Sequence, residues 1–257
     1  MSNVTIKNRC LLNSLSTKSG EPGNMIINMN TYQTSLAEFI NERKQAMAKI
    51  AAGQPWLLLI ATPIYVNTEK IDPLEDNFRK ILTDPPAPVD KWSDGIHSGR
   101  PEPRLFGIEA TFPRAHPDYE KALRLFRNGH LEYCQRIWGN HEESTLPISA
   151  RKNAIYLIQF LKVANKIQKL AEISEPITVI LHFQNIKRSF LLRPETPYPF
   201  MAKDSYVWQK ENLSIEITVS ELSEYSKIAH TIINRLFNAF GYEDNPLFDS
   251  DGKFFKK

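Results

Sequence analysis

Residues 55–63 spell Pro-Trp-Leu-Leu-Leu-Ile-Ala-Thr-Pro, and this is the longest apolar run in the chain. A short, continuous apolar run bounded by prolines is typical of a strand that is buried on both faces. The run is also too short to cross a bilayer, which takes about 20 residues. We therefore predict a buried strand at 56–61 and no membrane-spanning segment here.

Helical and strand patterns continue on both sides of this run. Ser35-Leu36-Ala37-Glu38 has the pattern of a capping box, and the helix that it starts ends at Gly53. Periodicity and boundary residues predict the other elements, which are helices at 73–82, 149–172 and 224–240 and strands at 104–112, 119–126, 130–138, 177–183 and 213–219.

Asn128-Gly129 stands between two of these strands and is a strong hairpin signal. It predicts a hairpin at 121–138 closed by a primed turn. The order of elements predicts an α+β or mixed α/β fold, in which helices pack on a mostly antiparallel sheet. We expect a single α/β domain at 35–257, preceded by a flexible arm at 1–34 that is rich in Asn, Ser and Thr.

The composition excludes several classes of protein. The chain has 257 residues, 42 % of them hydrophobic, and a net charge of +3. These values exclude a disordered or collagen-like chain. Two cysteines, Cys10 and Cys134, are too few for a disulfide framework or a four-thiolate zinc site. Because the N-terminus also lacks the apolar core of a signal peptide, we expect reduced thiols in a cytoplasmic protein.

The common catalytic motifs are absent from the sequence. It contains no P-loop, no GxGxxG and no GxSxG, so we predict no cofactor and no catalytic residue. His116 and His141 stand next to acids but lack the second histidine that a zincin helix requires. His182 lies inside an apolar strand, which favours a core histidine. The residues 248–252 lack the flanking acids of a calcium loop and predict a tight turn. We therefore predict no metal site.

A metal-dependent nuclease is one alternative that the acids leave open. Nucleases of the restriction type hold magnesium with an acid on one strand and an acid-x-Lys on the next. Glu216-Ile217-Thr218 lacks the lysine, and Glu109 has no evident partner in the sequence.

Charge is unevenly distributed along the chain. Residues 151–193 carry eight basic residues against two glutamates, and residues 211–251 carry eight acids against two basic residues. The first segment predicts either a nucleic-acid surface or a solvated helix face that the acidic segment partly neutralises. The candidate nucleic-acid contacts are Arg151, Lys152, Lys162, Lys166, Lys169, Lys187 and Arg188.

Three stretches at 39–63, 125–133 and 236–254 resemble, in the same order, a known group of proteins. They are similar to the C-terminal region of bacterial proteins that carry an N-terminal Schlafen/AlbA-type DNA-binding domain. The resemblance covers roughly residues 36–255. The residues of the shared motifs are Arg127, Asn128, Gly129, Glu132, Asn238, Gly241, Asp249, Asp251 and Gly252.

The resemblance implies a companion or sensor module. In such proteins the nucleic-acid site belongs to the N-terminal domain, and the roughly 35 residues before the matching region cannot hold it. The motifs also have a plain structural interpretation. Asn238 and Gly241 predict a helix end, and 249–252 predict a turn that docks Phe254 and Phe255.

We therefore expect a non-enzymatic recognition or regulatory module that acts in a multi-protein complex. By analogy with Schlafen-like proteins, that complex would serve bacterial anti-phage defence. The expected partners are other proteins or further copies of the chain, with no membrane. The alternatives are a nucleic-acid-binding protein that uses residues 151–193 and the metal-dependent nuclease.

Overall fold

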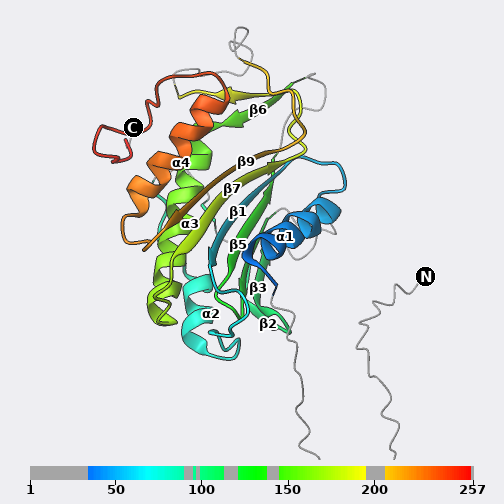
Figure 1. Cartoon of the computed structure of the whole chain (residues 1–257), viewed down its shortest axis with the longest axis vertical. Helices are drawn as coiled ribbons and strands as arrows, with labels where there is room; N and C mark the ends of the chain where they lie inside the picture. The colour runs from blue at the N-terminus through cyan, green and yellow to red at the C-terminus, as the bar shows by residue number, and fades with distance from the viewer. Residues whose placement is uncertain are drawn as a thin grey trace, which may run out of the picture. The chain divides into compact units, whose positions relative to one another are not determined.

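A large antiparallel sheet organises the computed structural model, which describes residues 34–89, 95–96, 99–112, 121–137, 145–194 and 206–255 (Figure 1). The seven strands run in the spatial order β2 (Glu102–Arg104), β3 (Gly107–Phe112), β4 (Lys121–Phe126), β5 (Leu131–Arg136), β1 (Trp56–Pro63), β7 (Ile177–Gln184) and β9 (Leu213–Val219). All neighbouring pairs are antiparallel. This confirms the mostly antiparallel sheet that we predicted.

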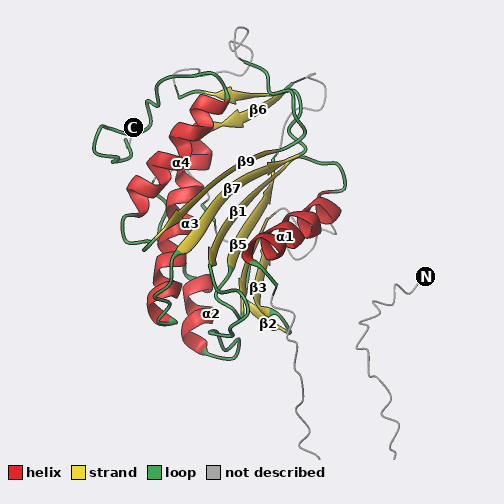
Figure 2. Ribbon diagram, in the orientation of Figure 1, coloured by secondary structure: helices red, strands yellow, loops and turns green. Residues whose placement is uncertain are grey.

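Helices flank this sheet, as Figure 2 shows. The helices of the described part are α1 (Leu36–Ala51), α2 (Asp76–Thr83), α3 (Ala150–Leu170) and α4 (Tyr225–Ala239). The α+β prediction is therefore confirmed. The short strands β6 (Leu146–Ser149) and β8 (Ser189–Leu192) form a separate parallel pair that the sequence did not predict. Within the described residues, no helix is long and apolar enough to cross a membrane.

The strand β1 lies inside the sheet between β5 and β7, and all of its residues are buried. Because side chains alternate along a strand, β1 serves two cores. Leu57 and Leu59 pack with side chains of α2, α3 and α4 on one face. Leu58 and Ile60 pack with Ile40 and Met47 of α1 on the other face. The sheet is therefore the middle layer of three.

Local signals in the sequence place several helix ends correctly. The hydroxyl of Ser35 accepts a hydrogen bond from the Glu38 N–H at 3.2 Å, and the Glu38 carboxylate accepts one from the Ser35 N–H at 2.9 Å. These two bonds form the predicted capping box and lower the pKa of Glu38. Gly241, at a φ of +77°, ends α4 where we predicted.

The hairpin at 121–138 forms, but its turn is of another type. A type I′ turn needs a positive φ at both central residues, and here only Gly129 has one, at +83°. The Phe126 N–H donates to the His130 carbonyl at 2.8 Å across a three-residue loop. The prediction of a primed turn is wrong because Asn128 does not adopt a positive φ. Its side chain donates to the Val66 carbonyl and ties the hairpin to the loop between β1 and α2.

The single strand predicted at 104–112 is in fact the hairpin β2–β3. Leu105 and Phe106 form its turn, and Leu105 is 93 % exposed. Gly107 makes the turn possible, since it has a φ of +151° and its Cα faces the Leu125 carbonyl oxygen so closely that a Cβ would stand 2.0 Å from it. Apolar composition suggested a continuous strand, but this close approach breaks it.

The C-terminal turn forms around Asp249, whose carboxylate accepts hydrogen bonds from the N–H groups of Asp251 and Lys253. Phe254 is buried, as predicted, whereas Phe255 is 45 % exposed, so its predicted docking is wrong. Other predictions lie outside the described residues and concern Cys10, His116, His141 and the arm at 1–34, of which only Thr34 is described.

Gly107→Ala should lower the free energy of unfolding by at least about 3 kcal/mol, since a Cβ there meets backbone as well as an unfavourable φ. Gly53→Ala is the matched control, because Gly53 also has a positive φ, +82°, but open space around it. It should cost about 1 kcal/mol. Urea unfolding of both variants measures the difference, and equal losses would contradict the role given to the close approach.

Candidate functional site

The strand β9 forms a long edge of the sheet, next to α4 in Figure 1. It has seven residues, whereas β2 at the opposite edge has three. Among the described residues, β9 pairs only with β7. A long edge strand presents a row of backbone N–H and C=O groups that another extended chain can pair with.

Arg235 of α4 shows which backbone groups point outward from β9. Its guanidinium donates to the Glu216 carbonyl at 2.9 Å. In an antiparallel ladder the N–H and C=O of one residue point to the same side, and the side alternates along the strand. The backbone groups of Ser214, Glu216 and Thr218 therefore point away from β7. Within the described residues, Arg235 is the only group bonded to this edge.

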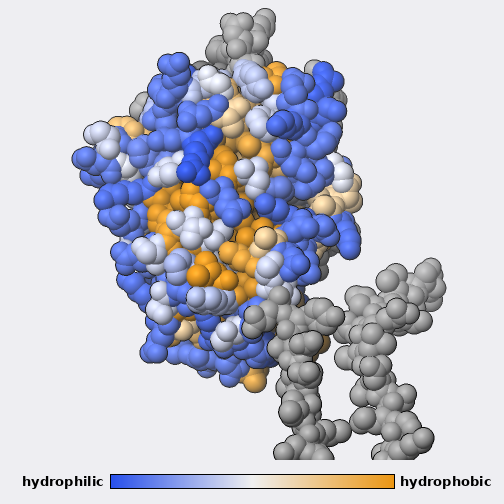
Figure 3. Space-filling view, viewed as in Figure 1, coloured by the Kyte–Doolittle hydropathy of each residue, from blue (hydrophilic) through white to orange (hydrophobic). Residues whose placement is uncertain are grey.

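A groove of about 450 Å³ runs between β9 and α4. Ile217 and Val219 of β9 and Ile228 of α4 supply its apolar surface. Figure 3 shows apolar surface in this part of the molecule, bordered by polar residues. The polar lining of the groove consists of Thr218, Ser220, Glu221, Glu224, Lys227, Thr231 and Arg235.

The opposite side of β9, which faces the α1 layer, is polar. The side chains of Ser214, Glu216 and Thr218 are exposed there. Lys44 of α1 donates to the Ser214 hydroxyl at 2.9 Å. Partial burial lowers the pKa of Lys44, and the nearby Glu216 opposes this shift. The edge strand thus has one apolar side and one polar side.

The predicted basic residues fall into separate groups. Arg151 and Lys152 are in the first turn of α3, and Lys187 and Arg188 are in the loop between β7 and β8. The other three are in the second half of α3 and are Lys162, Lys166 and Lys169. Lys152 and Lys166 are about 21 Å apart along the helix axis, at 1.5 Å per residue. The structure therefore does not gather the seven residues into one surface.

Several of these cations contact acidic or aromatic side chains. Lys187 pairs with Glu211 at 3.4 Å, and Arg193 pairs with Asp244 at 3.2 Å. The Lys162 ammonium lies 5.3 Å from the centre of the Tyr225 ring, and the Arg151 guanidinium lies at the same distance from the Phe254 ring. The acidic segment does neutralise part of the basic one. Lys166 and Lys169 are exposed, with no ion pair among the described residues.

Glu132 is the motif residue with the most partners. Its carboxylate is buried beneath α1 and accepts two hydrogen bonds from Arg43, at 2.8 and 3.0 Å, and one from Arg124 at 2.9 Å. Its other neighbour is His130, with Nε2 at 3.3 Å. Burial alone would raise the pKa of Glu132, but the hydrogen bonds from His130 and Arg43 and the charge of Arg43 hold it well below its usual range.

The network continues to Glu109, which accepts from Arg124 at 2.8 Å and from Arg104 at 3.2 Å. Glu109 therefore has the partners that were not evident from the sequence. Cys134 lies against Arg124 as a buried free thiol, and burial raises its pKa to about 11. Because these groups bond to one another, we interpret them as a structural cluster.

The other motif residues shape turns. The Arg127 carbonyl accepts from the N–H groups of Lys70 and Ile71, and a Cβ on Gly129 would meet Ile173 at 2.6 Å. The Gly252 carbonyl accepts from the Ser226 hydroxyl at 2.6 Å and ties the C-terminal turn to α4. The exposed Asn238 accepts the Gly241 N–H through its backbone carbonyl at the end of α4.

The described histidines also have local partners. His182 is 5 % exposed, and its Nε2 lies 3.1 Å from the Gln184 side chain, which fits the predicted core histidine. Burial lowers the pKa of His182, and the charge of Lys44 acts in the same direction. Among the residues that the structure describes, no group of three or more His, Cys, Asp or Glu side chains could hold a metal ion.

Comparison with known proteins identified no relative of this chain. A scan against protein-family models, a search of curated proteins and a search of solved structures each gave no significant match to this chain. The candidate site is therefore described from its own geometry.

The sequence patterns did not predict that β9 lies at an edge of the sheet. The alternation of Leu213, Ile215, Ile217 and Val219 predicts a strand with one buried side but does not say which strands neighbour it. A charged residue at the centre of that alternation, Glu216, is the available signal, because charges on the outer side are common on edge strands.

Glu132→Gln should lower the free energy of unfolding at pH 7 by about 3–5 kcal/mol, since it removes the buried counter-charge of Arg43 and leaves Arg124 paired with Glu109 alone. A carboxylate with a lowered pKa stabilises the fold above its unfolded pKa, near 4.3, and the contribution fades as the pH falls. The difference from wild type should therefore narrow below about pH 4.

The control is Glu102→Gln, because Glu102 pairs with Arg104 at a partly exposed position. It should change the free energy of unfolding by less than about 1 kcal/mol. Urea denaturation at pH 3, 5 and 7 measures both variants, and a deficit for Glu132→Gln that does not depend on pH would contradict the charge network.

Proposed function

We propose that this protein is a non-enzymatic recognition module that binds an extended segment of a partner protein along the open edge of β9. The observation that carries this proposal is the outward row of backbone groups at Ser214, Glu216 and Thr218, next to a largely polar groove with an apolar strip from Ile217, Val219 and Ile228. Addition of a strand to an exposed sheet edge is a common way for proteins to bind peptides.

The two sides of β9 define the chemistry of the bound segment. Residues on one side of an added strand would lie over Ile217, Val219 and Ile228, which favours apolar side chains there. Residues on the other side would lie next to Glu216, which is exposed. We therefore expect a segment that alternates apolar residues with Lys or Arg.

The resemblance to the C-terminal region of Schlafen/AlbA-type proteins extends this proposal to a biological role. A module that binds a segment of another protein would act in a multi-protein complex, and by analogy that complex would serve bacterial defence. The role in defence depends on sequence resemblance alone and is separate from the geometric argument for β9.

Thr218→Pro tests the docking edge directly. The Thr218 N–H points away from β7, so proline removes an outward donor and leaves the β7–β9 ladder in place, as edge strands allow. Thr218→Val is the matched control, since it also loses the hydroxyl but keeps the N–H. A partner recovered from the native host should bind wild type and Thr218→Val alike and bind Thr218→Pro at least about tenfold more weakly.

Hydrogen exchange supplies an independent measurement. The amides of Ser214, Glu216 and Thr218 should exchange fast in the isolated protein and slowly in the complex, whereas those of Ile215 and Ile217 should be slow in both. Equal binding of the proline variant would overturn the proposal. Self-association by light scattering that Thr218→Pro abolishes would assign the edge to a second copy of the chain.

Nucleic-acid binding is a second candidate function. It is favoured by the exposed Lys166 and Lys169, which lie one turn apart on α3 without ion pairs among the described residues. The division of the remaining cations between α3 and the loop from β7 to β8 weighs against one continuous nucleic-acid surface.

A titration with duplex DNA and single-stranded RNA at several salt concentrations tests this candidate. Lys166→Glu combined with Lys169→Glu should reduce the slope of log K against log salt by about two. Lys49→Glu, an exposed position on α1, is the control and should leave the slope unchanged. An affinity that does not vary with salt would exclude nucleic acid as the ligand.

A further inference from the structure

A second hollow lies between the N-terminus of α3 and the ends of β1, β5 and β6, away from the β9 edge. Its volume is about 120 Å³. An engineered apolar cavity of about 150 Å³ holds benzene, so this smaller hollow fits an apolar group no larger than a benzene ring. Its lining residues are Leu57, Gln135, Arg136, Ile137, Pro147, Ile148, Ser149, Lys152, Asn153 and Tyr156.

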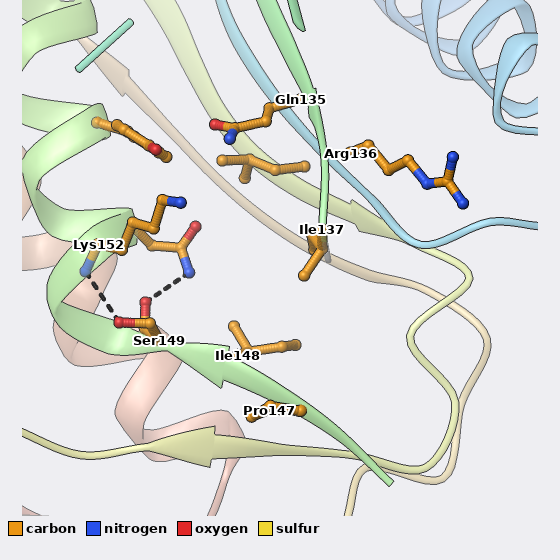
Figure 4. Close-up of a pocket in the computed structure, with 10 residues that line it drawn as sticks. Gln135, Arg136, Ile137, Pro147, Ile148, Ser149 and Lys152 are labelled. Carbon is orange, nitrogen blue, oxygen red and sulfur yellow. Dashed lines mark hydrogen bonds between the residues drawn. The ribbon is translucent and has the colours of Figure 1, made fainter. Parts of the chain in front are cut away.

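Lys152 brings a positive charge to this cavity. Figure 4 shows its side chain extending into the hollow from the first turn of α3, toward Gln135. Lys152 is exposed to solvent, and its ammonium lies 5.4 Å from the centre of the Tyr156 ring. By contrast, the Arg136 side chain points away from the hollow and donates to Gln54 at 2.9 Å.

Two amide side chains in the cavity have unused hydrogen-bonding atoms. Asn153 is 7 % exposed, and its Nδ2 donates to the Ser149 carbonyl at 2.8 Å, but its Oδ1 accepts from no described residue. Gln135 accepts from the Tyr133 hydroxyl at 2.7 Å, and its Nε2 has no acceptor among the described residues. The Gln135 Nε2 can therefore donate to a ligand carboxylate, whereas the Asn153 Oδ1 can only accept and does not bond to one.

The electrostatics of the lining favour a negative charge. None of the described lining residues is Asp or Glu, whereas Lys152 and the positive end of the α3 dipole both face the hollow. Ser149 caps the helix by accepting the Lys152 N–H at 3.2 Å, so the helix begins at the wall of the hollow.

The remaining wall is apolar and consists of Leu57, Ile137, Pro147 and Ile148. An apolar group on the bound anion would therefore pack against this wall. We propose that the cavity binds a small organic acid whose apolar part is no larger than a benzene ring. Its carboxylate pairs with Lys152 and the Gln135 amide, and its apolar part packs on Ile137 and Ile148.

Calorimetric titration of the full chain with sodium benzoate tests this proposal. Benzoate should bind saturably, and benzyl alcohol, which has a similar shape and no charge, should bind at least about tenfold more weakly. Lys152→Met keeps the length of the side chain and removes the charge, so it should weaken benzoate binding about tenfold or more and leave benzyl alcohol unaffected.

Two further variants separate the cavity from general effects of charge and folding. Lys166→Met removes an exposed charge from the same helix and should leave benzoate affinity unchanged. Ile148→Trp fills the hollow and should abolish binding, while circular dichroism reports whether the fold persists. Absence of saturable binding up to about 10 mM benzoate, or equal affinity in wild type and Lys152→Met, overturns the proposal.

Discussion

The burial of β1 on both faces is the constraint on which the rest of the structure depends. Leu57 and Leu59 need one apolar layer packed against them, which we call a cover. Leu58 and Ile60 need another on the opposite face of the sheet. Each fully buried side chain of this kind contributes about 1.5–3 kcal/mol, so neither cover is dispensable. The chain supplies α2, α3 and α4 on one face and α1 on the other, and β5 and β7 pair with the two edges of β1.

The two covers are held by different interactions. The layer of α3 and α4 packs through apolar side chains, whereas α1 also reaches the sheet through the Arg43–Glu132 pair. A buried carboxylate is costly unless it is paired and hydrogen-bonded, and Glu132 accepts from two arginines. Since these bonds depend on direction as well as distance, they fix the place of α1 over β5.

This layering also explains where the candidate sites lie. The centre of the sheet is covered on both faces and paired on both edges, so it offers no access to a ligand. Access remains at the boundaries of the layers. One boundary is the outer edge of β9 beside α4, and the other is the hollow where α3 begins next to the ends of β1 and β5. Both sites are supported by rigid elements, which favours a preformed geometry.

Much of the fold follows from local sequence patterns, because they act over a few residues. The apolar run at 56–61, the capping box at Ser35, the hairpin around Asn128-Gly129 and the stop at Gly241 each predict an element that the structure contains. What only the tertiary structure decided is how distant elements meet: the edge position of β9, the pairing of Arg43 with Glu132, and the separation of the basic residues along α3. These relations depend on strand order and helix packing, which join residues far apart in the chain, so no local pattern contains them.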